Sequence, residues 1–253
     1  MTSQRVVRAL IILFLAGLAA AAPAGAQSAA ASGKWQFEIT PYFWLSGLKT
    51  DIKMRLFPEK STEVSFSELS KLVHLGLSGM FEARKDRWGF LIDAMYVDLG
   101  TTVAQSGTMP GDVDVTLKNS GFSLAGLARV VEGQAAVDLL AGARYYYMNS
   151  SLRVTTGPFS GLAKSSTDKW VDGFVGARLL VSLARAWTLV GYADVGTGGS
   201  NLAWQAYAGL DIRFSRVFYG KLGYRYSYFD RDQDGGYLKQ AKSGIYTGLG
   251  IRF

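Results

Sequence analysis

The strongest constraint on the fold is the final stretch of the chain, Ser243 to Phe253, in which side-chain character alternates with a period of two. Its odd-numbered positions from Ile245 onward carry apolar residues and a threonine, whereas its even-numbered positions carry glycines, a tyrosine and Arg252. A β-strand between two different environments alternates in this way. A transmembrane β-barrel requires the alternation, because one face meets lipid and the other meets the lumen. We therefore ask whether the rest of the chain repeats it.

Similar segments recur along the chain and predict an all-β, up-and-down transmembrane barrel of ten antiparallel strands, with eight strands as the alternative. Short turns follow the second, fourth, sixth and eighth segments, and generally longer loops separate the others, which is typical of an outer-membrane barrel. The predicted strands cover about residues 35–48, 73–84, 88–99, 113–131, 135–148, 168–182, 187–196, 202–214, 217–229 and the end of the chain to residue 253.

Local irregularities are expected at three places. Pro41 lacks a backbone N–H, so a ladder hydrogen bond is lost in the first strand. Residues 49–72 have mixed charge and no clean period, which predicts a long external loop with a short helical turn at 66–72. The apolar positions of 113–131 change parity, and a bulge within 119–121 would reconcile them.

The first 26 residues have the features of a cleavable signal peptide. Arg5 and Arg8 precede an apolar run from Ala9 to Ala22, and Ala24-Gly25-Ala26 forms an A-x-A cleavage site. We expect a short N-terminal segment at 27–34 and one barrel domain at 35–253. An exported chain without a second long apolar stretch is best suited to the outer membrane of a Gram-negative bacterium.

Composition excludes several classes of site. The chain contains no cysteine, so it has neither disulfides nor thiolate metal sites. Its formal net charge of +7 includes no Lys/Arg run and accompanies no nucleic-acid-binding motif. We predict no cofactor, no metal and no nucleic-acid partner. The expected partners are outer-membrane lipid and lipopolysaccharide, and the sequence does not determine an oligomeric state, a solute or a ligand.

The predicted inward faces carry charges of alternating sign. Acidic residues occur on most upward strands, and arginines occur toward the periplasmic ends of the downward strands, often two positions after a glycine. One interpretation is an Arg–carboxylate network that fills the lumen and holds the strands in register; the other is a narrow pore with ion or solute preference. The predicted lumen-lining charges are Glu38, Arg84, Asp93, Arg129, Asp138, Arg144, Asp172, Arg178, Asp194, Arg213, Arg225 and Arg252.

Catalysis has little support in the sequence. The single histidine, His74, is predicted to point inward near the external rim, within reach of a loop carboxylate such as Glu68. A lone rim histidine is more often a solvated polar residue than a catalytic one. We therefore predict that the protein is not an enzyme, and a barrel-rim enzyme or ligand binder remains the second alternative.

Several segments resemble uncharacterised proteobacterial outer-membrane β-barrel proteins of the porin and opacity-protein type. They are Pro41-Tyr42-Phe43-Trp44, Phe81-Glu82-Ala83-Arg84, Asp168-Lys169-Trp170-Val171-Asp172, Gly191-Tyr192-Ala193-Asp194, Leu222-Gly223-Tyr224-Arg225 and Gly248-Leu249-Gly250-Ile251-Arg252-Phe253. The resemblance implies no established activity. It does imply that Phe253 and its strand are the signal recognised by the outer-membrane assembly machinery. Gly173 departs from the pattern, in which proline is expected.

Overall fold

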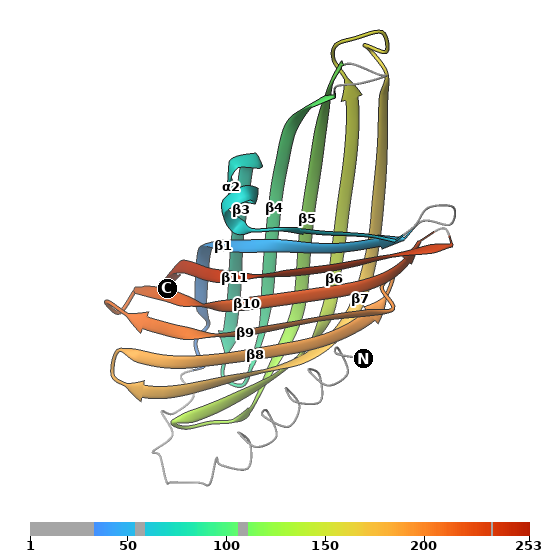
Figure 1. The fold of residues 1–253 in the computed structure, drawn as a ribbon. Coiled ribbons are helices and arrows are strands. Elements are labelled where there is room, and N and C mark those ends of the chain that lie inside the picture. Colours follow the sequence, from blue (N-terminus) through green and yellow to red (C-terminus); the bar gives the residue numbers. More distant parts are fainter. Residues whose placement is uncertain (1–32, 54–58, 106–110, 234) are drawn as a thin grey trace.

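The computed structural model describes residues 33–53, 59–105, 111–233 and 235–253, and the predicted signal peptide lies outside them. Ten strands form a closed antiparallel barrel in which each pairs with the next and the last pairs with the first (Figure 1). This confirms the ten-strand prediction over the eight-strand alternative. The barrel strands are β1 (Gln36–Lys53), β3 (Val73–Lys85), β4 (Trp88–Gln105), β5 (Gly111–Val131), β6 (Ala135–Val154), β7 (Ala163–Ala184), β8 (Trp187–Gly198), β9 (Leu202–Arg213), β10 (Phe218–Gln233) and β11 (Gly236–Arg252).

The end of the chain closes the barrel. β11 pairs with β1 from Glu38↔Arg252 to Lys53↔Tyr237. The backbone N–H groups of Phe37 and Phe253 each donate to the other residue's carbonyl at 2.9 Å. Their rings are stacked with centroids 5.7 Å apart. The strand that predicts the fold therefore also forms its seam.

The predicted irregularity at Pro41 is confirmed. β1 pairs with β3 only as far as Pro41↔Gly79, and its pairing with β11 is interrupted at residues 40–41. Directly above, the Ser78 hydroxyl donates to the Tyr42 carbonyl at 2.8 Å, which satisfies an acceptor where the ladder has ended.

An insertion lies between the outer halves of β1 and β3. β2 (Lys60–Val64) pairs with β1 from Leu48↔Val64 to Ile52↔Lys60, and α2 (Phe66–Leu72) follows. The helical turn predicted at 66–72 is thus confirmed, whereas the prediction of a plain loop at 49–72 is wrong, because β1 extends to Lys53 and the short strand β2 is present.

The predicted loops at residues 100–112 and 149–167 are mostly strand. The ladder of β4 and β5 continues to Gln105↔Gly111, and that of β6 and β7 continues to Arg153↔Ala163. Outside lipid, the two faces of a strand no longer meet different solvents, so the sequence alternation stops while backbone pairing continues. Figure 1 shows these long hairpins projecting beyond the rest of the barrel.

The bulge predicted within residues 119–121 is wrong. β5 pairs with β4 without any shift from Gln105↔Gly111 to Trp88↔Ala128. The register shift lies instead between Arg129 and Val131, opposite β6. The early apolar residues of β5, Val113, Val115 and Leu117, therefore face the same way as Ser123. They lie in the part of the strand that extends past the lipid.

The outer surface carries an apolar band bordered by aromatic residues at the periplasmic strand ends. The band consists of exposed Ile39, Phe43, Phe90, Phe122, Leu124, Leu139, Val171, Val175, Leu189, Val195, Leu222, Tyr224, Ile245 and Leu249. Trp35, Trp88, Trp187, Phe214, Phe218 and Phe253 form the aromatic border. This arrangement suits a lipid core with a water boundary. In the described part of the chain, no helix is long and apolar enough to cross a membrane.

Candidate functional site in the barrel lumen

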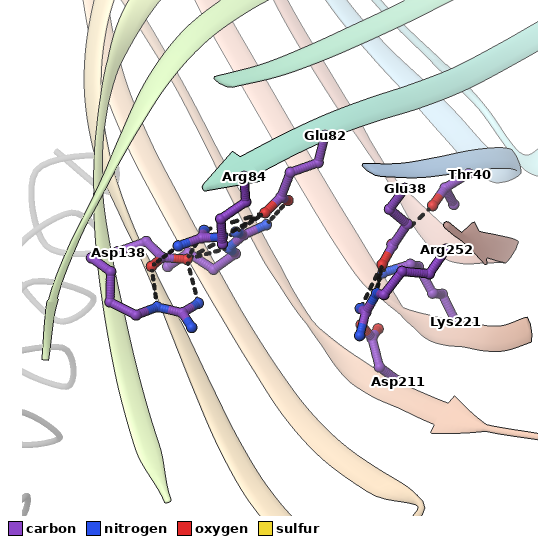
Figure 2. A network of polar contacts seen from close by, with 10 residues as sticks. Glu38, Thr40, Glu82, Arg84, Asp138, Asp211, Lys221 and Arg252 are labelled. Atoms are coloured by element: carbon purple, nitrogen blue, oxygen red, sulfur yellow. Dashed lines mark hydrogen bonds and ion pairs between the residues drawn. The ribbon is translucent and has the colours of Figure 1, made fainter. Parts of the chain in front are cut away.

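The periplasmic part of the lumen is built around Asp138 of β6, whose side chain is completely buried. Arg129 of β5 and Arg178 of β7 are its partners in register on the two neighbouring strands. Their guanidinium groups reach its carboxylate at 2.8 Å each. Arg84 of β3 is a third donor at 2.9 Å (Figure 2).

Glu82 connects this group across the lumen. Arg178 donates to Glu82 at 2.6 and 2.9 Å, and Arg84 lies 3.2 Å from the same carboxylate. β3 and β7 are not neighbours in the sheet, so the pair ties opposite parts of the wall. We call Glu82, Arg84, Arg129, Asp138 and Arg178 the lower network. Glu82 shares the parity of Arg84, two positions later on β3, but it is not among the predicted lumen-lining charges.

A second group lies beside the seam. Glu38 of β1 accepts from Arg252 at 2.6 Å and lies 2.8 Å from the Lys221 ammonium. Lys221 of β10 also contacts Asp211 of β9 at 2.8 Å (Figure 2). The Arg252 guanidinium lies 4.0 Å from the centre of the Tyr219 ring. These four charged residues, Glu38, Asp211, Lys221 and Arg252, form the seam cluster.

Farther toward the outer side, two ion pairs join strands that are not neighbours in the sheet. Arg144 of β6 pairs with Asp194 of β8 at 2.7 Å, and Arg225 of β10 pairs with Asp93 of β4 at 2.8 Å. Gln205 of β9 joins them, since its amide donates to Asp194 at 2.6 Å and accepts from Arg225 at 2.8 Å. We call these five residues the upper network.

Tyrosine and serine hydroxyls complete the upper network. Tyr42 donates to Asp93 at 2.6 Å, and Tyr192 donates to Asp194 at 2.5 Å. Ser123 accepts from Arg144 at 3.1 Å. Sequence periodicity predicts the inward direction of Tyr42 and Tyr192, but it does not predict these partners. The pairing depends on the tilt of the strands, which brings distant strands into reach across the lumen.

Two of the predicted lumen-lining charges lie outside these networks. Asp172 is buried but accepts from the Ser200 backbone N–H at 2.7 Å, so it organises the turn between β8 and β9. No ion pair of Asp172 is formed within the described residues. Arg213 is exposed at the periplasmic rim and donates to the Arg185 carbonyl. The other ten lie in the lower network, the seam cluster or the upper network.

The remaining space in the lumen is divided. A cavity of about 270 Å³ lies at the periplasmic end, between the lower network and the seam cluster. A space of about 90 Å³ lies in the middle, lined partly by Leu91 and Leu140. A recess of about 60 Å³ lies on the outer side of the upper network. Beyond it, Trp170, Phe229 and Leu238 form an apolar cluster with Tyr146 packed against it.

His74 does not face the lumen as predicted. The register of β3 and β4 shifts between Val73 and Leu75, so His74 is the extra residue. Its imidazole is exposed and lies against Gly100, where an added Cβ would be 2.2 Å from Cε1. Within the described residues it makes no hydrogen bond with Glu68, and no group of His, Asp and Glu side chains is placed to hold a metal.

The sequence matches no protein-family profile and no curated protein. The fold is similar to the outer-membrane protease OmpT from Escherichia coli, with a TM-score of 0.58 at 8% identity over 88% of this chain and 98% of that one. The translocator domain of autotransporter NalP from Neisseria meningitidis matches over 88% and 90%, at 13% identity and a TM-score of 0.44.

A third solved structure, the attachment invasion locus protein Ail of Yersinia pestis, matches over 87% of this chain and 99% of that one, with 10% identity and a TM-score of 0.37. The chain has the fold of an outer-membrane β-barrel protein. Its closed sheet and apolar outer band place it in the outer membrane of a Gram-negative bacterium, because only a barrel without free edges satisfies its backbone in lipid.

Proposed function

We propose that this protein is a structural or surface barrel of the outer membrane whose lumen is sealed by its own side chains. The observation that carries the proposal is ion pairing within the lumen: Arg178 with Glu82 and Arg225 with Asp93 join distant strands, and Arg144 with Asp194 reaches past one intervening strand. Each pair joins strands that are not neighbours in the sheet. The side chains that make these pairs occupy the path that a solute would follow.

The balance of charge supports a structural role over ion selection. The seam cluster and the upper network each contain two carboxylates and two cations, and the lower network contains two carboxylates and three arginines, so the charges of the lumen are near balance. A buried ion pair that loses one partner destabilises a protein by about 3–5 kcal/mol. A folded barrel therefore needs near-balanced signs, whereas a selective pore would present one sign to the solute.

Planar-bilayer recording tests the sealed lumen. Pure refolded protein is expected to give no discrete conductance steps, while its heat-modifiable gel mobility verifies that the barrel has folded. Discrete openings from folded protein would overturn the proposal in favour of a narrow pore.

The outer surface supports membrane partners. Its apolar band suits lipid acyl chains, so we propose outer-membrane lipid and lipopolysaccharide as its surroundings. We also propose that the outer-membrane assembly machinery recognises the β11 strand through Phe253. This residue is 64% exposed on the lipid side although it forms the seam with Phe37, so its ring remains available to another protein.

We assign no catalytic step to the protein. The position of His74 against Gly100, outside the lumen, supports a non-enzymatic role. Surface adhesion or another phenotype of the wild-type strain should be unchanged in a His74→Ala strain. A phenotype lost on this substitution, with normal amounts of folded barrel, would contradict that assignment.

A further inference from the structure

The cavity of about 270 Å³ at the periplasmic end of the lumen is accessible from the periplasm. Its lining includes Gln36 of β1, Gly133 in the turn between β5 and β6 and Ser182 of β7, which are all exposed. The lower network and the seam cluster lie on separate sides of this space (Figure 2). No residue of the buried apolar clusters in the described part of the chain belongs to the lining. A periplasmic ligand therefore reaches the cavity without passing either group.

The charges around this cavity are not fully balanced. The seam cluster contains two carboxylates and two cations, but in the lower network three arginines share only Asp138 and Glu82. Asp138 is also completely buried behind its arginines and does not contribute to the lining. The lower network therefore presents one positive charge in excess to the cavity.

Arg129 is the arginine with an unused edge. Its Nε and Nη2 atoms donate to Asp138 at 2.8 and 3.2 Å, and its Nη1 atom makes no hydrogen bond within the described residues. All three nitrogens of Arg84 and of Arg178 are hydrogen-bonded. Because a guanidinium is planar, Nη1 points away from the carboxylate that the other two nitrogens hold. The Arg129 side chain lines the cavity and is 25% exposed, so a ligand can contact it.

The periplasmic turns outside the cavity are also basic. Within the described chain they carry six exposed basic side chains and two exposed acidic ones. The basic residues are Lys34, Lys85, Arg87, Arg185, Arg213 and Arg216, and the acidic residues are Asp86 and Glu132. Clustered charge of one sign attracts ligands of the other sign. A small anion inside the cavity would not extend to these turns, whereas a chain that carries several carboxylates would contact both.

We propose that the periplasmic cavity binds an acidic peptide segment of a periplasmic partner. One carboxylate of the segment accepts from the Nη1 edge of Arg129 and balances the third arginine of the lower network. A phosphate dianion would exceed the single excess charge, so a carboxylate is the better match. Further acidic residues of the segment contact the basic turns. The site goes beyond the sealed-barrel function and does not depend on it, because the segment stays on the periplasmic side of the lower network.

Calorimetric titration of the full mature protein, folded in detergent micelles, tests the site. The probes are an end-blocked peptide of three glutamates, the matching peptide of three glutamines, and glutarate, at an ionic strength held constant with sodium chloride. We expect saturable binding of the acidic peptide, about fivefold tighter or more than glutarate because additional exposed ion pairs form. No saturable binding of the acidic peptide, or equal affinity for the glutamine peptide, would overturn the proposal. Equal affinity for glutarate would overturn the peptide partner in favour of a small carboxylate.

Arg129→Gln locates the binding within the cavity. It should weaken binding of the acidic peptide by about tenfold or more, because a charge-assisted hydrogen bond is lost. The substitution leaves two arginines against the two carboxylates of the lower network, so we expect the variant to fold with heat-modifiable mobility.

A second variant tests the basic turns without touching the lumen. Arg216→Gln should weaken binding of the acidic peptide and leave the affinity for glutarate unchanged. Arg153→Gln is the control, because Arg153 is exposed near the outer end of β6, at the opposite end of the barrel. Equal peptide affinity of wild type, Arg129→Gln and Arg216→Gln, all folded, would show that the peptide binds elsewhere and would overturn the assignment.

The titration is distinguishable from the conductance experiment. A barrel that conducts but binds the acidic peptide as expected would contradict only the sealed lumen. A barrel that is sealed but does not bind the peptide would contradict only the periplasmic site.

Discussion

Asp138 shows how much a single buried charge can organise. Three arginines converge on its fully buried carboxylate. Asp138→Asn would leave these guanidinium groups with Glu82 as the remaining carboxylate of the lower network. We expect the free energy of unfolding in micelles to fall by about 3–5 kcal/mol, because the loss leaves buried charges uncompensated. Urea unfolding followed by tryptophan fluorescence measures this.

Glu132→Gln is the matched control for Asp138→Asn. Glu132 pairs with Arg87 between two periplasmic turns, where both side chains are largely exposed. A solvated pair of this kind contributes about 0–1 kcal/mol. Equal losses in the two variants would show that burial of the lower network does not determine its energetic role.

Gly142 is a second residue with a strict steric requirement, because the structure leaves no space for a side chain there. An added Cβ would lie 2.1 Å from the Leu124 carbonyl oxygen and 2.7 Å from the Ala125 Cα atom. Gly142→Ala is expected to destabilise the barrel by about 1–3 kcal/mol, since the backbone of β5 must move. Gly121→Ala on β5 is the control, because nothing lies within 4 Å of its added Cβ. Loss of stability in the control alone would contradict this reasoning.

Sequence alone predicts which residues face inward better than it predicts their partners. The inward direction of Arg144 follows from a period of two, but its partner Asp194 is two strands away in the sheet. Register and barrel tilt decide that contact, and neither is encoded in one strand's alternation. Arg213 has the correct parity and still lies outside the lumen, because the strand ends there.

The helix α2 is held by local interactions that the sequence does contain. Ser65 and Glu68 form a capping box: the Ser65 hydroxyl accepts from the Glu68 N–H, and the Glu68 carboxylate accepts from the Ser65 N–H at 2.9 Å. The hydrogen bonds from Ser65 hold the pKa of Glu68 below its usual range. Local capping chemistry explains why the helical turn at 66–72 is predictable while the neighbouring strand β2 is not.

A pH dependence follows for this helix. Because the folded-state pKa of Glu68 is depressed, its contribution is complete above the unfolded pKa and is lost as pH falls through the folded value. We expect amide exchange in residues 65–72 to accelerate between neutral pH and about pH 3 beyond the intrinsic change. Ser65→Ala should reduce that pH dependence. A Ser65→Ala variant with the wild-type profile would show that the capping box does not hold the helix.

The seam strand β11 carries a separate prediction. Phe253→Ala removes an exposed ring and its stacking on Phe37 while the backbone hydrogen bonds can remain. If the assembly machinery recognises this ring, less heat-modifiable protein should reach the outer membrane. Phe214→Ala is the control, because Phe214 is similarly exposed on the same aromatic border. Equal membrane yields for Phe253→Ala and wild type would contradict the proposed signal.

At the level of the whole molecule, the lower and upper networks act as partitions between cavities. Arg178 lines both the periplasmic and the middle cavity, and Arg225 lines both the middle cavity and the outer recess. The sequence indicates that the lumen is charged and narrow. It does not indicate whether the lumen is divided, because that depends on long side chains from opposite walls meeting in space.

Removing Arg178 and Arg225, two of the side chains that neighbouring cavities share, should join the cavities. In the double variant Arg178→Ala and Arg225→Ala, Asp138 retains Arg84 and Arg129, and Asp93 retains the Tyr42 hydroxyl, so these two buried carboxylates keep hydrogen-bond partners. We expect folded double variant to give small discrete conductance steps in planar bilayers, while wild type and Arg213→Ala give none. Arg213 is the control because it lies at the rim. If the folded double variant gives no conductance steps, the arginines are not what seals the lumen. The seal would then be the apolar cluster around Trp170 and Phe229, which occupies the outer end of the same path.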